Sequence, residues 1–331
     1  MELSELLNLA GGHAPARAIQ VALKMGLFEA LAEGALDASA LATRIGAVAP
    51  TTALLANALT AIGLLEKASG GYTLTPDARR FLLRSSGNYV GGMIAFDGEV
   101  FPLWSGLEDT IRDGRPAREP DMFQHDPQET RLFIGAMDSL VRARGDAVYL
   151  AQHLDLSQIA TIADVGGGPG TYMMEFLGRF PHLRATILDL PATLRAAREI
   201  LESRDRGLRA RLELMQYDYR SQEFPATFDA IFLSNIIHGE NEATNRALVQ
   251  RCYRGLTRGG TLIVKDHIMD ASLVEPAAGA IFSLYLMLVT QGRDYSFDEV
   301  AGWLKEAGFS RIRQQHLPAP PFTSSLVVAH K

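Results

Sequence analysis

Residues 159–170 read IATIADVGGGPG, and this stretch decides the fold. Its first part is a short apolar run of the kind that forms a buried strand, and its second part is a run of glycines. Glycines at such a place let the backbone turn tightly and let a ligand lie against it. The next residues, TYMMEFLGRF at 171–180, predict a helix. A strand, a glycine loop and a helix in this order predict a nucleotide-type binding loop.

The loop has the spacing Gly166-x-Gly168-x-Gly170, and an acid, Asp164, comes before it. Loops of this type serve both dinucleotides and S-adenosylmethionine. A pyrophosphate is bound best at a helix N-terminus without a carboxylate beside it. The sulfonium and ammonium groups of S-adenosylmethionine, in contrast, suit a neighbouring carboxylate. The loop therefore favours S-adenosylmethionine, with an NAD-dependent dehydrogenase as an alternative.

Strands and helices alternate from the loop to the C-terminus. This alternation is typical of an α/β fold, here a Rossmann-like, doubly wound and mostly parallel sheet. In such a sheet the ligand lies outside the carboxyl ends of the strands. Further strands are expected at 184–190, 211–218, 228–237, 259–270, 312–317 and 324–331, and further helices at 193–203, 241–256 and 296–309.

The N-terminal part has a different pattern. Helical spacing of apolar residues predicts helices at 14–34, with an interruption at Gly26, and at 38–45 and 50–64. A hairpin and a helix from Pro76 follow within 64–82. We interpret residues 1–90 as a mainly helical winged-helix domain. Residues 91–331 then hold a mainly helical segment that reaches to about residue 153 and the α/β domain.

The N-terminal domain is expected to form a homodimer, because helices this apolar need a cover. The helix expected at 50–64, where a recognition helix would sit, contains ALLANALTAIG, which offers no Arg, Lys or Gln to read base edges. The net charge of −6 and the lack of a dense basic block also argue against a nucleic-acid partner. A winged-helix regulator that senses a ligand therefore stays a lesser alternative.

Bulk features place the protein in the cytoplasm. The N-terminus lacks a signal peptide, and the longest apolar stretch, residues 277–290, is too short to span a bilayer. The single cysteine, Cys252, excludes an internal disulfide and is interpreted as a buried hydrophobe. No ligand cluster calls for a metal.

Acidic residues end the second and third strands of the sheet. Asp189 follows ATIL and can accept both ribose hydroxyls of a nucleoside, and a helix N-cap is the other role open to it. Asp218 ends the next strand, where its carboxylate can accept from an adenine amino group while Tyr219 stacks nearby.

His238 ends the fourth strand, FDAIFLSNII, which places an imidazole at the ligand-binding edge as a candidate general base. Asp266 after the fifth strand and Asp294 in the loop QGRDYS fall at similar positions. A carboxylate beside an imidazole holds its tautomer and raises its basicity. His267 is expected to point to the opposite face if the strand continues there, because side chains alternate along a strand.

Aromatic side chains and methionines gather in the helical segment that precedes the α/β part of the chain. They fit the helix core and a pocket for a flat organic substrate equally well. The candidate substrate-binding residues are Phe96, Phe101, Trp104, Phe133 and Met137.

Together these residues make the chain resemble the plant-type small-molecule O-methyltransferases and their bacterial relatives. The resemblance covers nearly the whole chain, from ARAIQVALKMGLFEAL at 16–31 through DVGGGPG to SFDEVAGWLKEAGF at 296–309. It implies a dimerisation domain and an S-adenosylmethionine-dependent O-methyltransferase that acts on a small aromatic or polyketide-like molecule. The loop glycines would hold the methionine part, Asp189 the ribose, and Asp218 with Tyr219 the adenine. We add Asp164, Leu190 and Ser234 to this cofactor-binding set.

The chain departs from the family pattern around the base. In the family the catalytic histidine opens a His-Asp-Trp run, whereas Gly239 and Glu240 follow His238 here. Asp266 and Asp294 stand where the plant enzymes carry glutamates, and Ser234 replaces a frequent lysine. These departures leave a C- or N-methyltransferase, or a non-methylating enzyme of the same fold, as alternatives.

Overall fold

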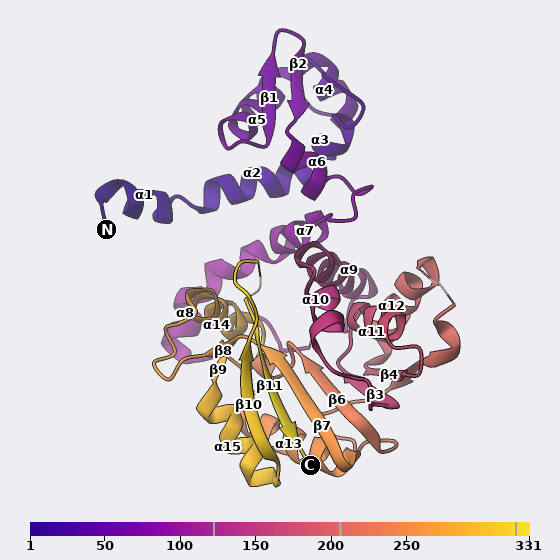
Figure 1. Cartoon of the computed structure of the whole chain (residues 1–331). Helices are drawn as coiled ribbons and strands as arrows, with labels where there is room; N and C mark the ends of the chain where they lie inside the picture. Colours follow the sequence, from indigo (N-terminus) through magenta and orange to yellow (C-terminus); the bar gives the residue numbers. More distant parts are fainter. Residues whose placement is uncertain (122, 205–206, 322) are drawn as a thin grey trace. The chain divides into compact units, whose positions relative to one another are not determined.

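The computed structural model describes residues 1–121, 123–204, 207–321 and 323–331 (Figure 1). The chain forms two compact units, one of residues 1–101 and 135–143 and the other of residues 102–134 and 144–331. The first unit therefore includes α7 (Gly91–Val100) and part of α9 (Pro127–Arg144) in addition to residues 1–90.

In the first unit, short helices precede a two-stranded hairpin, as the sequence predicts. The helical stretch expected at 14–34 is divided at Gly26, whose φ of 74° lies in the left-handed region that favours glycine. The strands β1 and β2 pair antiparallel, and the Thr75 side chain caps the helix that follows. The elements are α1 (Leu3–Ala10), α2 (His13–Lys24), α3 (Leu27–Ala30), α4 (Ala38–Ile45), α5 (Ala49–Ala61), β1 (Leu65–Ala68), β2 (Gly71–Leu74) and α6 (Pro76–Leu82).

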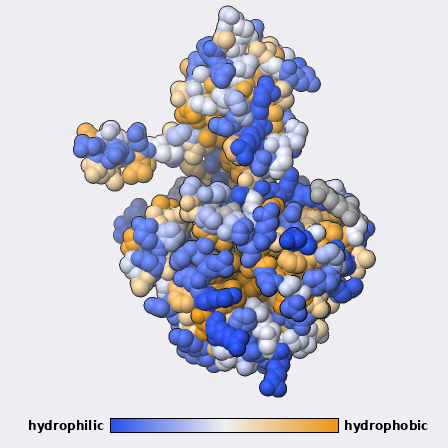
Figure 2. All heavy atoms as spheres, in the orientation of Figure 1, coloured by the Kyte–Doolittle hydropathy of each residue, from blue (hydrophilic) through white to orange (hydrophobic). Residues whose placement is uncertain are grey.

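The helix α1 was not predicted, and it keeps its leucines at the surface. Leu3, Leu6, Leu7 and Leu9 are all more than half exposed. Figure 2 shows hydrophobic side chains on α1, at the left of the view. An amphipathic helix with no buried residue of its own is typical of a segment that another chain covers.

The second unit is built on a seven-stranded sheet, which confirms the predicted α/β fold class. The spatial order is β10-β11-β7-β6-β3-β4-β5. Neighbours from β7 to β5 run parallel, and β11 runs antiparallel to both β7 and β10. The strands are β3 (Thr161–Val165), β4 (Arg184–Asp189), β5 (Leu212–Gln216), β6 (Phe228–Ser234), β7 (Leu256–Asp266), β10 (Ser310–His316) and β11 (Ser325–His330).

Alternation along β6 shows how the two faces of the sheet are covered. Ile231 and Leu233 belong to the core that includes residues of α13 (Glu242–Gly255) and α15 (Phe297–Ala307). Phe232, between them, packs edge-on against Phe176 of α11 (Thr171–Arg179). Because successive side chains of a strand point to opposite faces, helices cover both sides of the sheet. This is the doubly wound arrangement.

Two further helices belong to this unit: α10 (Asp146–His153) precedes β3, and α12 (Pro191–Ser203) follows β4. The remaining elements are α8 (Leu107–Asp113), α14 (Ala277–Val289), the 3₁₀ turns η1 (Phe101–Gly106), η2 (Arg209–Arg211) and η3 (Ile237–Gly239), and the short strands β8 (Ile268–Met269) and β9 (Tyr295–Ser296). Among the described residues, no helix combines the length and hydrophobicity that crossing a membrane requires.

The strand predicted for 259–270 is interrupted, which corrects one expectation. β7 ends at Asp266, and residues 268–269 leave the large sheet to pair with β9 instead. The apolar residues 277–290 that follow form α14 almost to their end. The break at Asp266 changes which side His267 faces, as described below.

Candidate active site

The glycine loop between β3 and α11 has the close-packed backbone that the sequence predicts. Gly166, Gly168 and Gly170 have φ angles of 64°, 53° and 74°. A Cβ on Gly166 would lie 2.3 Å from Ile236 Cδ1, and one on Gly170 would lie 2.6 Å from Ile187 Cδ1. The left-handed conformation therefore favours glycine at both positions, and a Cβ would also force the neighbouring isoleucine side chain to move.

Two carboxylates meet this loop. Asp164 is 1% exposed, and its carboxylate oxygens have no hydrogen-bond partner among the described residues. Asp189 ends β4 and accepts hydrogen bonds from the Gly168 N–H at 2.8 Å and the Leu190 N–H at 2.7 Å. Burial, together with the charge of Asp189, raises the pKa of Asp164 to about 8. Burial also raises the pKa of Asp189 to about 6, against the lowering effect of the two N–H donors.

This set, Asp164, Gly166–Gly170 and Asp189 with Leu190, is called the cofactor half below. It fits S-adenosylmethionine. A buried carboxylate without partners needs a cation or hydrogen-bond donors to stay ionised. The ligand's ammonium and ribose hydroxyls are groups of that kind, and the loop leaves its backbone free of side chains that would keep a ligand away.

The predicted adenine residues take part in a local network. The Asp218 carboxylate accepts from the Arg220 N–H at 2.9 Å and from the Ser221 hydroxyl at 2.7 Å, so it holds the turn after β5. The Tyr219 hydroxyl donates to Glu240 Oε1 at 2.6 Å. Arg220 also donates to this oxygen, from Nε at 2.8 Å. Glu240, which the sequence marked only as a departure, is thus a buried anchor that links the ends of β5 and β6.

Ser234 is the last residue of β6, and the chain turns sharply after it. Asn235 has a φ of 56° and buries an amide oxygen that has no partner within the described part of the chain. Left-handed asparagines are uncommon and are enriched in turns. Sequence reasoning missed Asn235, although its place between an apolar strand and His238 was a signal.

His238 lies on η3, directly after β6, and contacts Asp266 at the end of β7. Its Nδ1 is 2.6 Å from Asp266 Oδ1, and the backbone N–H of His238 donates to Asp266 Oδ2 at 3.4 Å. The His238 side chain is 14% exposed and that of Asp266 is 1% exposed. The bond to Asp266 directs the Nδ1 proton to the carboxylate, which leaves Nε2 as the basic nitrogen.

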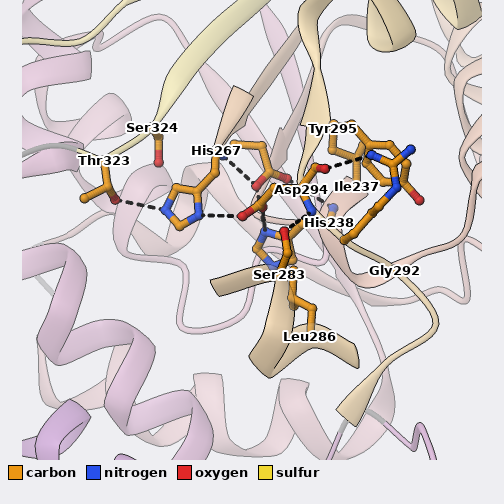
Figure 3. A network of polar contacts seen from close by, with 12 residues as sticks. Ile237, His238, His267, Ser283, Leu286, Gly292, Asp294, Tyr295, Thr323 and Ser324 are labelled. Carbon is orange, nitrogen blue, oxygen red and sulfur yellow. Dashed lines mark hydrogen bonds and ion pairs between the residues drawn. The ribbon is translucent and has the colours of Figure 1, made fainter. Parts of the chain in front are cut away.

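Asp294, from the loop before β9, joins this pair (Figure 3). Its Oδ1 is 3.9 Å from His238 Nδ1, and its side chain is fully buried. The loop comes close to η3 because Gly292 has no side chain. A Cβ at position 292 would lie 2.1 Å from the His238 carbonyl oxygen. The structure thus brings His238, Asp266 and Asp294 together as the sequence predicts.

His267 was expected on the opposite face if the strand continued there, but β7 ends at Asp266 and His267 faces the other catalytic candidates. Its Nδ1 lies 3.4 Å from Asp294 Oδ2, and its Nε2 lies 2.9 Å from the Thr323 hydroxyl. The reason is the break in the strand, because alternation holds only while the strand continues. Figure 3 shows His267 directed toward Asp294. We call His238, Asp266, His267 and Asp294 the acceptor half.

Charge and burial oppose each other in the acceptor half. Burial lowers the pKa of His238, but Asp266 and then Asp294 outweigh it, so the net shift of this pKa is upward. Burial raises the pKa of Asp266, but the neighbouring His238 outweighs this effect and the net shift is downward. The pKa of Asp294 is raised by burial, and His267 offsets only part of that effect.

One imidazole nitrogen of His238 and one carboxylate oxygen each of Asp266 and Asp294 lie within 4.8 Å of one another, and these are atom types that can bind a metal cation. The 2.6 Å contact between His238 and Asp266 is a direct hydrogen bond, however, and an ion bound between those atoms would separate them.

Aromatic side chains of α14 continue the acceptor half. Phe282 meets the His238 ring edge-on at 5.3 Å between centroids and the His267 ring at 5.2 Å. Tyr285 stacks on Phe282 at 5.7 Å, and Trp104 lies 6.3 Å from Tyr285. Of the predicted pocket residues, Trp104 thus contacts this row. Phe282 and Tyr285 were missed because the apolar stretch 277–290 was judged by its length alone.

The other predicted pocket residues are spread over both units. Phe133, in the second unit, stacks on Phe123 at 4.7 Å. Phe96, Phe101 and Met137 belong to the first unit. There Phe96 is buried, and the Arg17 guanidinium lies 5.5 Å from the centre of the Phe101 ring.

Comparisons with known proteins identify both parts of the chain as parts of an O-methyltransferase. The family model for the O-methyltransferase domain matches residues 104–310, and that for the O-methyltransferase dimerisation domain matches residues 7–84. The chain is 32% identical over 322 residues to 3-hydroxy-5-methyl-1-naphthoate 3-O-methyltransferase of Streptomyces sahachiroi, with 95% of this chain and 92% of the relative covered.

A second relative is the N,N-dimethyltransferase OxyT of Streptomyces rimosus, which is 27% identical over 323 residues, with 93% and 91% of the two chains covered. Among solved structures, PigF with SAH has a TM-score of 0.89 and 26% identity, with both chains covered over 100% of their length.

Proposed function

The chain belongs to the family of S-adenosylmethionine-dependent O-methyltransferases, and from this premise we propose that it methylates a hydroxyl of a small aromatic or polyketide-like molecule, with His238 as general base. The observation that supports this best is the pair of His238 and Asp266. The carboxylate binds Nδ1 at 2.6 Å, so the unshared electron pair lies on Nε2 of a ring that is partly exposed.

For the cofactor we propose that Asp164 receives the ammonium group and that Asp189 with Leu190 receives the ribose. Gly166, Gly168 and Gly170 would carry the methionine part on their backbone. The turn held by Asp218 and the ring of Tyr219 would frame the adenine, and Ser234 would complete the site. Support comes from the unpartnered Asp164 carboxylate and from the space that the glycines leave.

The reaction requires the protein to accept one proton from the substrate hydroxyl. When bound, S-adenosylmethionine would supply a methyl group attached to a sulfonium sulfur. The sulfur would keep the carbon–sulfur electron pair and leave as a thioether while the substrate oxygen bonds to the methyl carbon. His238 Nε2 accepts the proton of the substrate hydroxyl while its Nδ1–H stays on Asp266. Asp266 and Asp294 then stabilise the imidazolium by their charge. Orientation of the two reactants is expected to provide most of the remaining rate enhancement.

A flat aromatic acceptor is supported by the row of Phe282, Tyr285 and Trp104 that leads to the histidines. Aromatic faces offer a large apolar contact and favour an offset-stacked ligand. The Streptomyces sahachiroi relative acts, by its name, on a hydroxynaphthoate. We therefore propose fused-ring phenols as the acceptors to try first, with Phe133 of the same unit as a candidate for the rest of the pocket.

The test is transfer of labelled methyl from S-adenosylmethionine to a panel of naphthols, phenols and aromatic amines, followed by mass spectrometry of the product. An O-methyl ether that is lost in His238→Gln supports the proposal. A product methylated on nitrogen or carbon would support the second candidate instead, which the similarity to the N,N-dimethyltransferase OxyT favours. If S-adenosylmethionine binds but its methyl label is transferred to none of the acceptors, both candidate functions would be overturned.

We also propose that the protein works as a cytoplasmic homodimer. The match to the O-methyltransferase dimerisation domain and the exposed leucines of α1 support the dimer, and the single buried Cys252 suits a reducing compartment. Sedimentation at micromolar concentration should give twice the mass of the chain. A monomer, or a variant Leu6→Glu with unchanged mass, would speak against α1 as the contact.

A further inference from the structure

Both ring nitrogens of His267 face polar side chains, but among the described residues only Nε2 makes a regular hydrogen bond. Nε2 lies 2.9 Å from the Thr323 hydroxyl, and Nδ1 lies 3.4 Å from Asp294 Oδ2. Arg144 donates from Nη1 to the same Thr323 oxygen at 3.2 Å. The Thr323 hydroxyl can accept from Arg144 and donate its own proton to Nε2; in that arrangement the imidazole proton is on Nδ1, on the side of Asp294.

The ionised state of the Asp294 carboxylate depends on that Nδ1 proton. Its side chain is fully buried, and its carboxylate oxygens make no regular hydrogen bond to other described residues. The titratable groups that face it are His267, His238 from η3 and Asp266 at the end of β7, and the last of these is an anion. Of the two imidazoles His267 is the nearer, at 3.4 Å against 3.9 Å. A buried carboxylate that lost this neighbour would take up a proton.

We propose that His267 is a positioning residue that donates its Nδ1–H to Asp294, keeps that carboxylate ionised and aimed at His238, and thereby gives the base a second anionic neighbour. The inference rests on the proposed function in so far as His238 is the base. The chain runs from Thr323 through His267 and Asp294 to His238, and Figure 3 shows these side chains in that sequence.

The effect of Asp294 on His238 is one of charge. At 3.9 Å from Nδ1 it is too far for a hydrogen bond, which Asp266 already provides at 2.6 Å. In a site closed to water, a second negative charge at this distance stabilises the imidazolium that forms when the substrate proton is taken up. Contacts of this kind are expected to tighten when the ligands are bound.

The test compares His267→Leu, which removes the donor, with His267→Asn, whose amide nitrogen occupies the place of Nδ1. In His267→Leu, kcat should fall about tenfold, because the imidazolium of His238 loses one nearby negative charge. The acidic limb of its pH profile should move to lower pH, because a neutral Asp294 no longer raises the pKa of His238. His267→Asn should recover most of both changes, and KM for S-adenosylmethionine should stay constant throughout.

The control is His153→Leu, which removes an exposed histidine of α10 and should leave kcat and the pH profile unchanged. Asp294→Asn should reproduce the effects of His267→Leu, and the double variant should be no worse than either single one. The proposal is overturned if His267→Leu keeps full kcat. It is overturned equally if kcat falls while the pH limb stays in place, because that pattern describes a structural role only.

A second measurement needs no substrate and so separates this inference from the proposed function. The His238 ring is titrated by NMR in the complex with S-adenosylhomocysteine, and its signal is assigned by comparison with His238→Gln. The pKa of His238 should be lower in His267→Leu than in the wild type and intermediate or unchanged in His267→Asn. An unchanged value in His267→Leu contradicts the inference even if a methylated product has been found. A lowered value supports it even if no acceptor has.

Discussion

The cofactor half and the acceptor half stand at the same edge of one sheet, yet one buried carboxylate of each, Asp164 and Asp266, is held in opposite ways. In the cofactor half Asp164 has no partner among the described residues, and its pKa is raised to about 8. In the acceptor half Asp266 is already paired with His238, and its pKa is lowered. The first half is arranged to receive positive charge from outside, whereas the second supplies its own.

The two halves also differ in how they are built. The cofactor half comes from one strand–loop–helix unit and the end of the next strand, and backbone groups form most of it. The acceptor half collects side chains from η3, β7 and the loop before β9. A change in the cofactor half should therefore affect ligand affinity, and a change in the acceptor half should affect turnover.

The largest expected effect is in the acceptor half. His238→Gln should lower kcat by roughly a hundredfold to ten-thousandfold, the usual worth of a positioned general base. Binding of S-adenosylhomocysteine, measured by titration calorimetry, should stay within about twofold of the wild type. A variant that binds the ligand poorly would show that the two halves are not separable in the way described.

The same residue sets the pH dependence. Because the pKa of His238 is raised, wild-type kcat should rise with pH through a value above that of a free histidine. The contribution of His238 to the stability of the fold changes with pH in the opposite direction. It is fully present below the pKa of His238 in the unfolded chain and is lost as pH rises through the raised pKa in the folded protein. In His238→Gln the acidic limb of the kcat profile should disappear, and its persistence would assign the titration to another group.

In the cofactor half, Gly166→Val should weaken S-adenosylmethionine binding by about a hundredfold or more. The new Cβ would meet Ile236 at 2.3 Å, and the left-handed φ disfavours a β-branched residue. The matched control is Gly178→Ala in α11, where a Cβ meets nothing within 4 Å. The control should raise the free energy of unfolding by about 0.5–1 kcal/mol and leave binding unchanged. Equal losses in both variants would point to the fold and not to the loop.

The smallest effect concerns the proton on Asp164. With a pKa of about 8 the free protein carries this carboxyl protonated at pH 7, so its contribution to stability is lost as pH rises from the unfolded value through about 8. A bound ammonium group should expel close to one proton. Calorimetry of S-adenosylmethionine binding in two buffers with different ionisation enthalpies measures that release. Asp164→Asn should abolish it, and an unchanged release would place the proton elsewhere.

Much of the fold could be predicted because its signals are local. The apolar run before Gly166 and the switch to alternating strands and helices indicated the sheet, and Gly26 and Pro76 marked helix boundaries that the structure confirms. The glycine loop by itself left a dehydrogenase open. The matches to both O-methyltransferase family models decided that question.

The site was predictable only where strand ends determine position. His238, Asp266 and Asp294 meet as expected, since parallel strands end at one edge. His267 was misplaced because the break after Asp266 depends on pairing with β9, some thirty residues later. Phe282 and Tyr285 were overlooked because a run of apolar residues does not reveal which of them face a histidine.

Gly292 has a consequence for how such a site can change over generations. A Cβ at position 292 would lie 2.1 Å from the His238 carbonyl oxygen, a backbone atom that cannot rotate away as a side chain would. Any side chain at 292 would therefore push the loop of Asp294 away from η3. Selection on the base would thus hold position 292 to glycine, although this residue has no chemical group of its own to offer.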